Sequence, residues 1–233
     1  ESSYRVRARL HVSQRRLGFL REGTHQWCDA AATGQLSAAA LEAVDGFALA
    51  TGDGLLACES ILLSEDTGGA GRVLVCTLRP GAALEGWIGR PLTPGVTGVV
   101  VLTTRGHFLA AGADRLIERS RAWASAETGV PDVTWARRGA SFFQGNRFLV
   151  GPLLERVLNA AQGDHFVDLY AGVGLFAIPM AARGQRGLAV EGDEFSSGDL
   201  SANAQAWSDR LRVQAGAVEG VTGAAEAPEA DVV

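Results

Sequence analysis

The sequence predicts an α/β protein in which a doubly wound parallel sheet, incomplete at its C-terminal end, follows an α+β domain. The first observation is a buried-strand pattern over 166–169, a glycine turn over 171–174 and an apolar helix over 175–182. The second is another apolar strand over 187–190, which ends in Glu191. This order is typical of sheets that bind a nucleotide-like ligand at the carboxyl ends of their strands.

Three residue types in this stretch point to a ligand. Gly172 and Gly174 suit a turn that requires positive φ and a close approach of ligand to backbone. Glu191, about 20 residues further on, is placed to accept hydrogen bonds from a ribose diol. Asp168 completes the pattern Asp-x-x-x-Gly-x-Gly, which favours S-adenosylmethionine, because the acid can organise the loop and meet the cofactor's amino group. Ala177 also fits the third position of a dinucleotide fingerprint, so glycine spacing alone does not exclude NAD.

The region before this stretch reads as an α+β domain over 1–138. Residues 4–12 alternate polar and apolar side chains, which predicts a strand with arginines on one face, either solvated or in contact with RNA. The other expected elements are a hairpin partner over 17–20, a helix over 36–49, paired strands over 55–63 and 72–78, a short helix over 82–88 and a buried strand over 98–103.

The second domain is expected over 139–233. A helix over 148–161, with Leu149, Leu153, Leu154, Val157 and Leu158 in the core, leads into the glycine strand. After Glu191 we expect a helix over 198–207 and a strand over 211–214, which joins the strands at 167–169 and 188–190 in one parallel sheet. Residues 231–233 resemble the start of a fourth strand.

Hydropathy, cysteine content and charge indicate the cellular compartment and the kinds of partner that we expect. No apolar run approaches the ~20 residues of a membrane span and no signal peptide is visible, so we expect a cytoplasmic protein without a membrane partner. Cys28, Cys58 and Cys76 are scattered without a C-x-x-C pair, and no metal site is expected. The net charge is −5, yet residues 1–21 carry six arginines against one acid.

Four segments resemble one family, the RNA uracil-5-methyltransferases, which include the bacterial enzymes that make 5-methyluridine in tRNA and 23S rRNA. The segments are Ser141–Asn146, with the pattern F-x-Q-x-N, Asp168–Phe176, Val190–Gly192 and Ala202–Ala204. The resemblance implies a Rossmann-like class I methyltransferase sheet, the cofactor S-adenosyl-L-methionine and an RNA substrate, tRNA or rRNA. The implied reaction is methyl transfer to carbon 5 of uridine.

Matching positions imply cofactor roles. Gln144 would contact the methionine part, Tyr170 would line the pocket beside the glycine loop, and Glu191 would hold the ribose hydroxyls. The alternatives are a helix-capping amide, a core aromatic and a solvated strand-end acid. The residues expected to bind the cofactor are therefore Gln144, Asp168, Tyr170, Gly172, Gly174 and Glu191.

The chain also departs from the family pattern. Leu175 stands where many members have Asn or Thr. The family's Asp-Pro-Pro-Arg motif would follow Val233, with a cysteine that adds to carbon 6 of uracil further on, so we expect a fragment and assign no catalytic residue. Alternatives are another S-adenosylmethionine-dependent RNA methyltransferase, acting on cytosine carbon 5 or on nitrogen, and a non-catalytic RNA-binding remnant.

Overall fold

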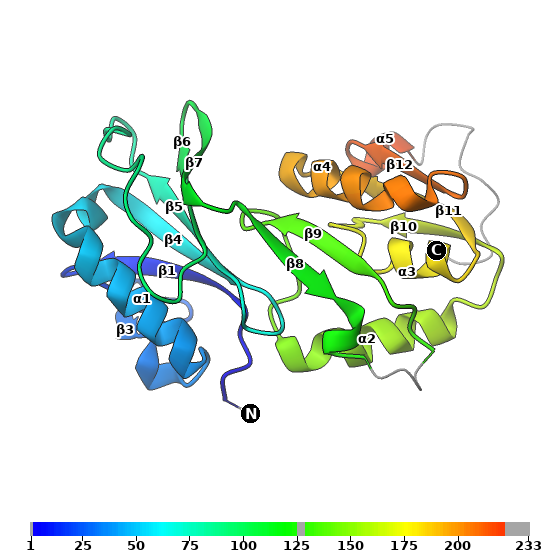
Figure 1. Ribbon diagram of the computed structural model, residues 1–233, viewed down its shortest axis with the longest axis horizontal. Helices are drawn as coiled ribbons and strands as arrows, with labels where there is room; N and C mark the ends of the chain where they lie inside the picture. Colours follow the sequence, from blue (N-terminus) through cyan, green and yellow to red (C-terminus); the bar gives the residue numbers. More distant parts are fainter. Residues whose placement is uncertain (1, 125–128, 222–233) are drawn as a thin grey trace. The chain divides into compact units, whose positions relative to one another are not determined.

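The computed structural model describes residues 2–124 and 129–221, which form two compact units (Figure 1). Unit 1 comprises Glu1–Leu116 and Gln144–Arg147, and unit 2 comprises Ile117–Phe143 and Phe148–Val233. Contacts therefore divide the chain after Leu116, upstream of the division at 138 that the sequence suggests. The reason is that β9 (Thr134–Arg138) packs against α4 (Glu194–Asn203) of unit 2.

Unit 1 is built on a seven-stranded sheet with the order β3-β2-β1-β4-β5-β6-β7. Every pairing is antiparallel except β5–β6, which is parallel. The predicted hairpin of β1 and β2 is confirmed, with His11 opposite Gly18. The strands are β1 (Arg7–Ser13), β2 (Arg16–Leu20), β3 (Trp27–Asp29), β4 (Cys58–Glu65), β5 (Arg72–Leu78), β6 (Gly98–Thr103) and β7 (Gly106–Gly112).

Helix α1 (Ala38–Thr51) is the main helix of unit 1 (Figure 1). The hydroxyl of Ser37 accepts a hydrogen bond from the Ala40 amide at 3.2 Å and so caps the helix start. The prediction of a helix over 82–88 is wrong, because this segment forms turns. Gly86 lies inside it, and glycine costs about 1 kcal/mol relative to alanine in a helix.

Unit 2 contains a three-stranded sheet with the order β10-β11-β12. Both pairings are parallel, with Leu169 opposite Val190 and Val190 opposite Gln214, which confirms the predicted sheet. Its strands are β10 (His165–Leu169), β11 (Arg186–Glu191) and β12 (Leu211–Ala215). A separate two-stranded sheet joins β8 (Arg115–Arg119) and β9. The fourth strand expected at 231–233 lies outside the described residues.

The helices of unit 2 flank its sheets. They are α2 (Arg147–Ala160), α3 (Ala177–Ala182), α4 and α5 (Val218–Val221). Helix α2 buries Val150, Leu154 and Leu158, one side chain per turn. Leu149, expected in the core, is 59% exposed, because it lies beside this narrow stripe rather than on it. Helix α4 begins four residues before the expected 198, at Glu194, where Asp193 caps it.

A fully buried ion pair holds β8 to β9. The guanidinium of Arg137 donates to Glu118 Oε1 from Nε and Nη2, at 2.9 and 2.7 Å, and both side chains are 0% exposed. Its Cζ atom also lies 4.6 Å from the ring centroid of Phe143. Charges this deep are stable only while each has its partner.

We therefore predict that Arg137→Met lowers the free energy of unfolding by about 3–5 kcal/mol, because it removes the guanidinium that balances the charge of the buried Glu118 carboxylate. Urea titration followed by circular dichroism measures this. The double variant Arg137→Met/Glu118→Leu should regain most of the loss. Arg121→Met is the control, since it breaks an exposed pair with Asp132 and should cost at most about 1 kcal/mol. A double variant as unstable as Arg137→Met would contradict this account.

Candidate cofactor-binding site

The turn between β10 and α3 has the backbone that its glycines predict. Gly172 and Gly174 have φ of 58° and 95°. A β-carbon on Gly174 would lie 2.6 Å from Ile178 Cδ1, whereas a β-carbon on Gly172 would meet nothing within 4 Å. Gly174 thus lets the turn pack closely on α3, and Gly172 leaves one stretch of backbone open to a ligand.

Glu191 ties this turn to the end of β11. Its side chain is 9% exposed. Oε2 accepts a hydrogen bond from the Gly172 amide at 2.8 Å, and Oε1 accepts one from the Asp193 amide at 2.7 Å. Each carboxylate oxygen has a further lone pair, so the same group can also accept hydrogen bonds from a ligand's hydroxyls.

Asp168 lies in β10 with its carboxyl group turned toward the start of α3. Oδ2 accepts a hydrogen bond from the Ala177 amide at 3.1 Å, so this acid organises the loop as the sequence predicts. Burial raises the pKa of Asp168 from 3.8 to about 7; the Ala177 bond lowers this pKa and the negative charge of Glu191 raises it. A cationic ligand group nearby would favour the ionised form.

Two further residues support the turn from outside. Trp135 Nε1, on β9, donates to the Gly174 carbonyl at 3.0 Å. Asn203 Nδ2, at the end of α4, donates to the carbonyls of Val173 and Ala136, at 3.1 and 3.0 Å. Sequence reasoning gave Trp135 no role and used Asn203 only as part of a motif. Helix α4 already contains a glutamate, an aspartate and three serines, so the local sequence contains no signal that singles out Asn203.

The first residues of the F-x-Q-x-N segment are anchored on α4. Asp199, which is 0% exposed, accepts a hydrogen bond at 2.6 Å both from the Ser141 hydroxyl and from the Arg138 amide. The Phe142 amide donates to Ser196 Oγ at 3.3 Å. Gln144, two residues on, is partly buried and belongs to unit 1, so its contact with a cofactor stays a prediction.

Five of the six expected residues lie in or beside this one turn of unit 2. Four of them, Asp168, Gly172, Gly174 and Glu191, are positioned by the contacts above. Tyr170 has φ of 60° and a side chain 70% exposed, so it is not a core aromatic. A cavity of about 430 Å³, lined mainly by apolar residues of α2, β10 and α3, has Asp168 alone of the six in its wall.

The described residues contain neither a candidate metal centre nor a candidate membrane span. Within 2–124 and 129–221, no three His, Cys, Asp or Glu side chains gather in a way that would hold a metal ion. No helix in the same ranges has the length and apolar character needed to cross a membrane.

The raised pKa of Asp168 predicts a pH-dependent stability. Because the folded-state pKa, about 7, exceeds the usual 3.8, the folded chain binds more protons than the unfolded chain between these values. The free energy of unfolding should therefore fall as pH rises toward 7, by on the order of 4 kcal/mol in total, and level off above it. Chemical unfolding from pH 4.5 to 8 should show this slope in the wild type relative to Asp168→Asn. Parallel curves for the two proteins would contradict the assignment.

Comparisons with known proteins find relatives in one class of RNA-modifying enzyme. No protein-family model matches the chain. The 23S rRNA (uracil(1939)-C(5))-methyltransferase RlmD of Ralstonia nicotianae is 42% identical over 62 residues, which are 27% of this chain and 14% of that protein. The tRNA (uracil(54)-C(5))-methyltransferase of Pyrococcus horikoshii is 34% identical over 65 residues, 28% of this chain and 16% of that protein. The matches thus span about one seventh of these relatives' length.

A solved structure extends the likeness in fold. The tRNA (uracil-54, C5)-methyltransferase of Pyrococcus abyssi, solved in complex with S-adenosyl-L-homocysteine, superposes with a TM-score of 0.70 at 17% identity. The superposition covers 93% of this chain and 55% of that one. This chain therefore shares sequence with RNA uracil-C5-methyltransferases over 62 to 65 residues and a fold with one of them over 93% of its length, which confirms the predicted resemblance to that family.

Proposed function

We propose that this chain is the S-adenosylmethionine-binding part of an enzyme that methylates carbon 5 of uridine in tRNA or rRNA. The observation that carries the proposal is the pairing of Glu191 with the open backbone of Gly172, next to a buried Asp168 whose pKa lies near neutrality. These groups stand at the carboxyl ends of adjacent parallel strands, where such sheets bind nucleotide-like ligands. The sequence relatives, all uracil-C5-methyltransferases of RNA, support the substrate and the position of the methyl group.

Each residue has a proposed task. Glu191 accepts hydrogen bonds from the ribose hydroxyls while it holds the turn. Asp168, once ionised, balances the cofactor's amino group, and the exposed ring of Tyr170 lies along the cofactor beside the glycines. Gln144 contacts the methionine part. When bound, S-adenosylmethionine supplies an activated methyl group; these side chains bind and orient it.

The covalent step of the family's reaction has no candidate among the three cysteines. Carbon 5 of uracil is a poor nucleophile until a thiolate adds to carbon 6. Cys58 and Cys76 are 0% exposed, and burial, together with a hydrogen bond with Cys58, raises the pKa of the Cys76 thiol. Cys28 is half-buried in β3. We propose that these 233 residues bind the cofactor without completing the transfer.

Two alternatives remain distinct in their outcomes. An RNA methyltransferase acting on cytosine carbon 5 or on nitrogen would bind the same cofactor but modify another atom. A non-catalytic RNA-binding remnant would bind RNA without binding the cofactor. Analysis of the modified nucleoside distinguishes the first alternative from the proposed function. Titration with the cofactor distinguishes the second.

We predict that Glu191→Ala weakens binding of S-adenosylhomocysteine about 10- to 100-fold, because a charge-assisted acceptor of about 1.5–3 kcal/mol is lost. Isothermal calorimetry measures this. Asn203→Ala is the matched control, since it also removes a hydrogen bond to the turn but no proposed cofactor contact; its loss should be several-fold smaller. Equal affinity of Glu191→Ala and wild type would remove Glu191 from the site. Tighter binding of NAD than of S-adenosylhomocysteine would overturn the cofactor assignment.

Methyl transfer tests the whole proposal. The full-length product of the gene should transfer labelled methyl groups to carbon 5 of uridine in undermodified tRNA or rRNA and form a stable adduct with RNA that contains 5-fluorouridine. The 233-residue chain should bind S-adenosylhomocysteine but do neither. A full-length product that leaves uridine unmodified in both RNA classes would refute the proposal. Adduct formation by the 233-residue chain that is lost on mutation of Cys28, Cys58 or Cys76 would show that this chain does carry the nucleophile.

A further inference from the structure

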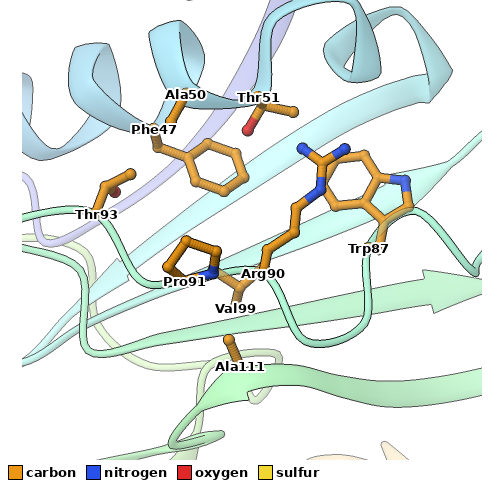
Figure 2. Close-up of a pocket in the computed structure, with 9 residues that line it drawn as sticks. All are labelled: Phe47, Ala50, Thr51, Trp87, Arg90, Pro91, Thr93, Val99 and Ala111. Atoms are coloured by element: carbon orange, nitrogen blue, oxygen red, sulfur yellow. The ribbon is translucent and has the colours of Figure 1, made fainter.

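Unit 1 contains a cavity of about 240 Å³ that the proposed function does not use. It lies between the C-terminal part of α1, the loop before β6, and strands β6 and β7. Figure 2 shows Phe47 and Thr51 of α1 facing Trp87 and Arg90 of that loop. The cavity is therefore enclosed by elements distant in sequence but held in one unit.

The wall of the cavity is apolar, aromatic and preformed. Phe47 and Trp87 are 5% and 3% exposed, with ring centroids 6.5 Å apart. Both side chains also belong to the main core of unit 1, so the core fixes their positions. Pro91 and Val99 complete this wall (Figure 2). Such a surface suits a flat, largely apolar group.

The remaining lining is polar and positively charged. The Arg90 Cζ atom lies 5.4 Å from the Trp87 ring centroid, and Nε donates to the Gly86 carbonyl. In the described part of the chain no carboxylate pairs with this guanidinium. Thr93 Oγ1 is buried and has no hydrogen-bond partner within the same residues. An unpaired buried hydroxyl is costly, so a ligand with a polar edge would relieve it.

We infer that this cavity binds one nucleotide of an RNA, with the base against Phe47 and Pro91 and a phosphate on Arg90. A purely apolar ligand would leave Arg90 and Thr93 unsatisfied, and a cation would be repelled by Arg90. A nucleotide matches both the aromatic and the charged part of the lining. Bases stack on aromatic rings and on guanidinium planes, and they present hydrogen-bond donors and acceptors at their edges. The choice of RNA over a free nucleotide rests on the proposed function.

The test compares variants of the full 233-residue chain. Arg90→Met removes the charge but keeps an apolar stem over Trp87. Ala50→Leu adds bulk at an exposed lining position without removing core contacts. Arg105→Met removes one charge from the exposed β6–β7 turn, outside the cavity, and is the matched control. The probes are uridine monophosphate, a fluorescent oligouridylate and inorganic phosphate, with S-adenosylhomocysteine as a separate ligand.

We expect oligouridylate to bind more tightly than uridine monophosphate, and both to lose on the order of 10-fold in affinity in Arg90→Met and in Ala50→Leu. Arg105→Met should stay within about twofold, and inorganic phosphate should compete poorly, because it lacks the base. Equal losses in Arg90→Met and Arg105→Met, or unchanged binding in Ala50→Leu, would overturn the inference. Binding of the mononucleotide but not of the oligonucleotide would overturn the assignment to RNA.

Failure here and failure of the proposed function give different results. Binding of S-adenosylhomocysteine with no nucleotide binding at the cavity overturns the inference and leaves the cofactor site intact. Nucleotide binding that depends on Arg90, without binding of S-adenosylhomocysteine, supports the cavity and overturns the cofactor site. All three variants should bind S-adenosylhomocysteine as the wild type does, since none of the substituted residues lies in unit 2.

Discussion

The carboxylate of Glu191 joins two backbone segments, the glycine turn after β10 and the start of α4 after β11. The parallel register, with Leu169 opposite Val190, brings the two strand ends side by side. Just beyond them, the amides of Gly172 and Asp193 both donate to this one side chain. A hydrogen bond to an ionised group contributes about 1.5–3 kcal/mol, so the shape of this edge depends on the acid.

The glycine turn after β10 is closely packed at Gly174 and open at Gly172. Trp135 and Asn203 hold its carbonyls, and Gly174 packs against α3 and α4, where Leu200 Cδ1 would lie 3.0 Å from an added β-carbon. The backbone of Tyr170 has a φ of 60°, which residues other than glycine rarely adopt, so the surrounding contacts must stabilise this conformation. A surface held in this way needs little reorganisation to receive a ligand, as the proposed cofactor site requires.

Local patterns were sufficient for the parallel strands, the glycine turn and the hydrogen bond by which Asp168 organises the loop, because strand periodicity and turn chemistry depend on near neighbours. The contacts of Trp135 and Asn203 with the turn were not predictable, since their partners lie 39 and 30 residues away. The same holds for Asp199, whose partner Ser141 is 58 residues distant. Leu149 shows the limit of periodicity, because an apolar residue beside the buried stripe of α2 still faces solvent.

The segment Gln144–Arg147 determines when unit 1 can finish folding during its synthesis. In this segment the Gly145 carbonyl accepts from the Val6 amide at 2.9 Å, and the Arg147 guanidinium pairs with Glu65, which also pairs with Arg72. Glu65 is fully buried, and Arg72 of β5 is its first cationic partner. Its second, Arg147, is added only once residue 147 has left the ribosome, by which time β8 and β9 have been made. Unit 1 can complete its folding only after residues 144–147 have been synthesised, and these follow the first strands of unit 2. A cleavage directly after Leu116 therefore does not release an intact unit 1.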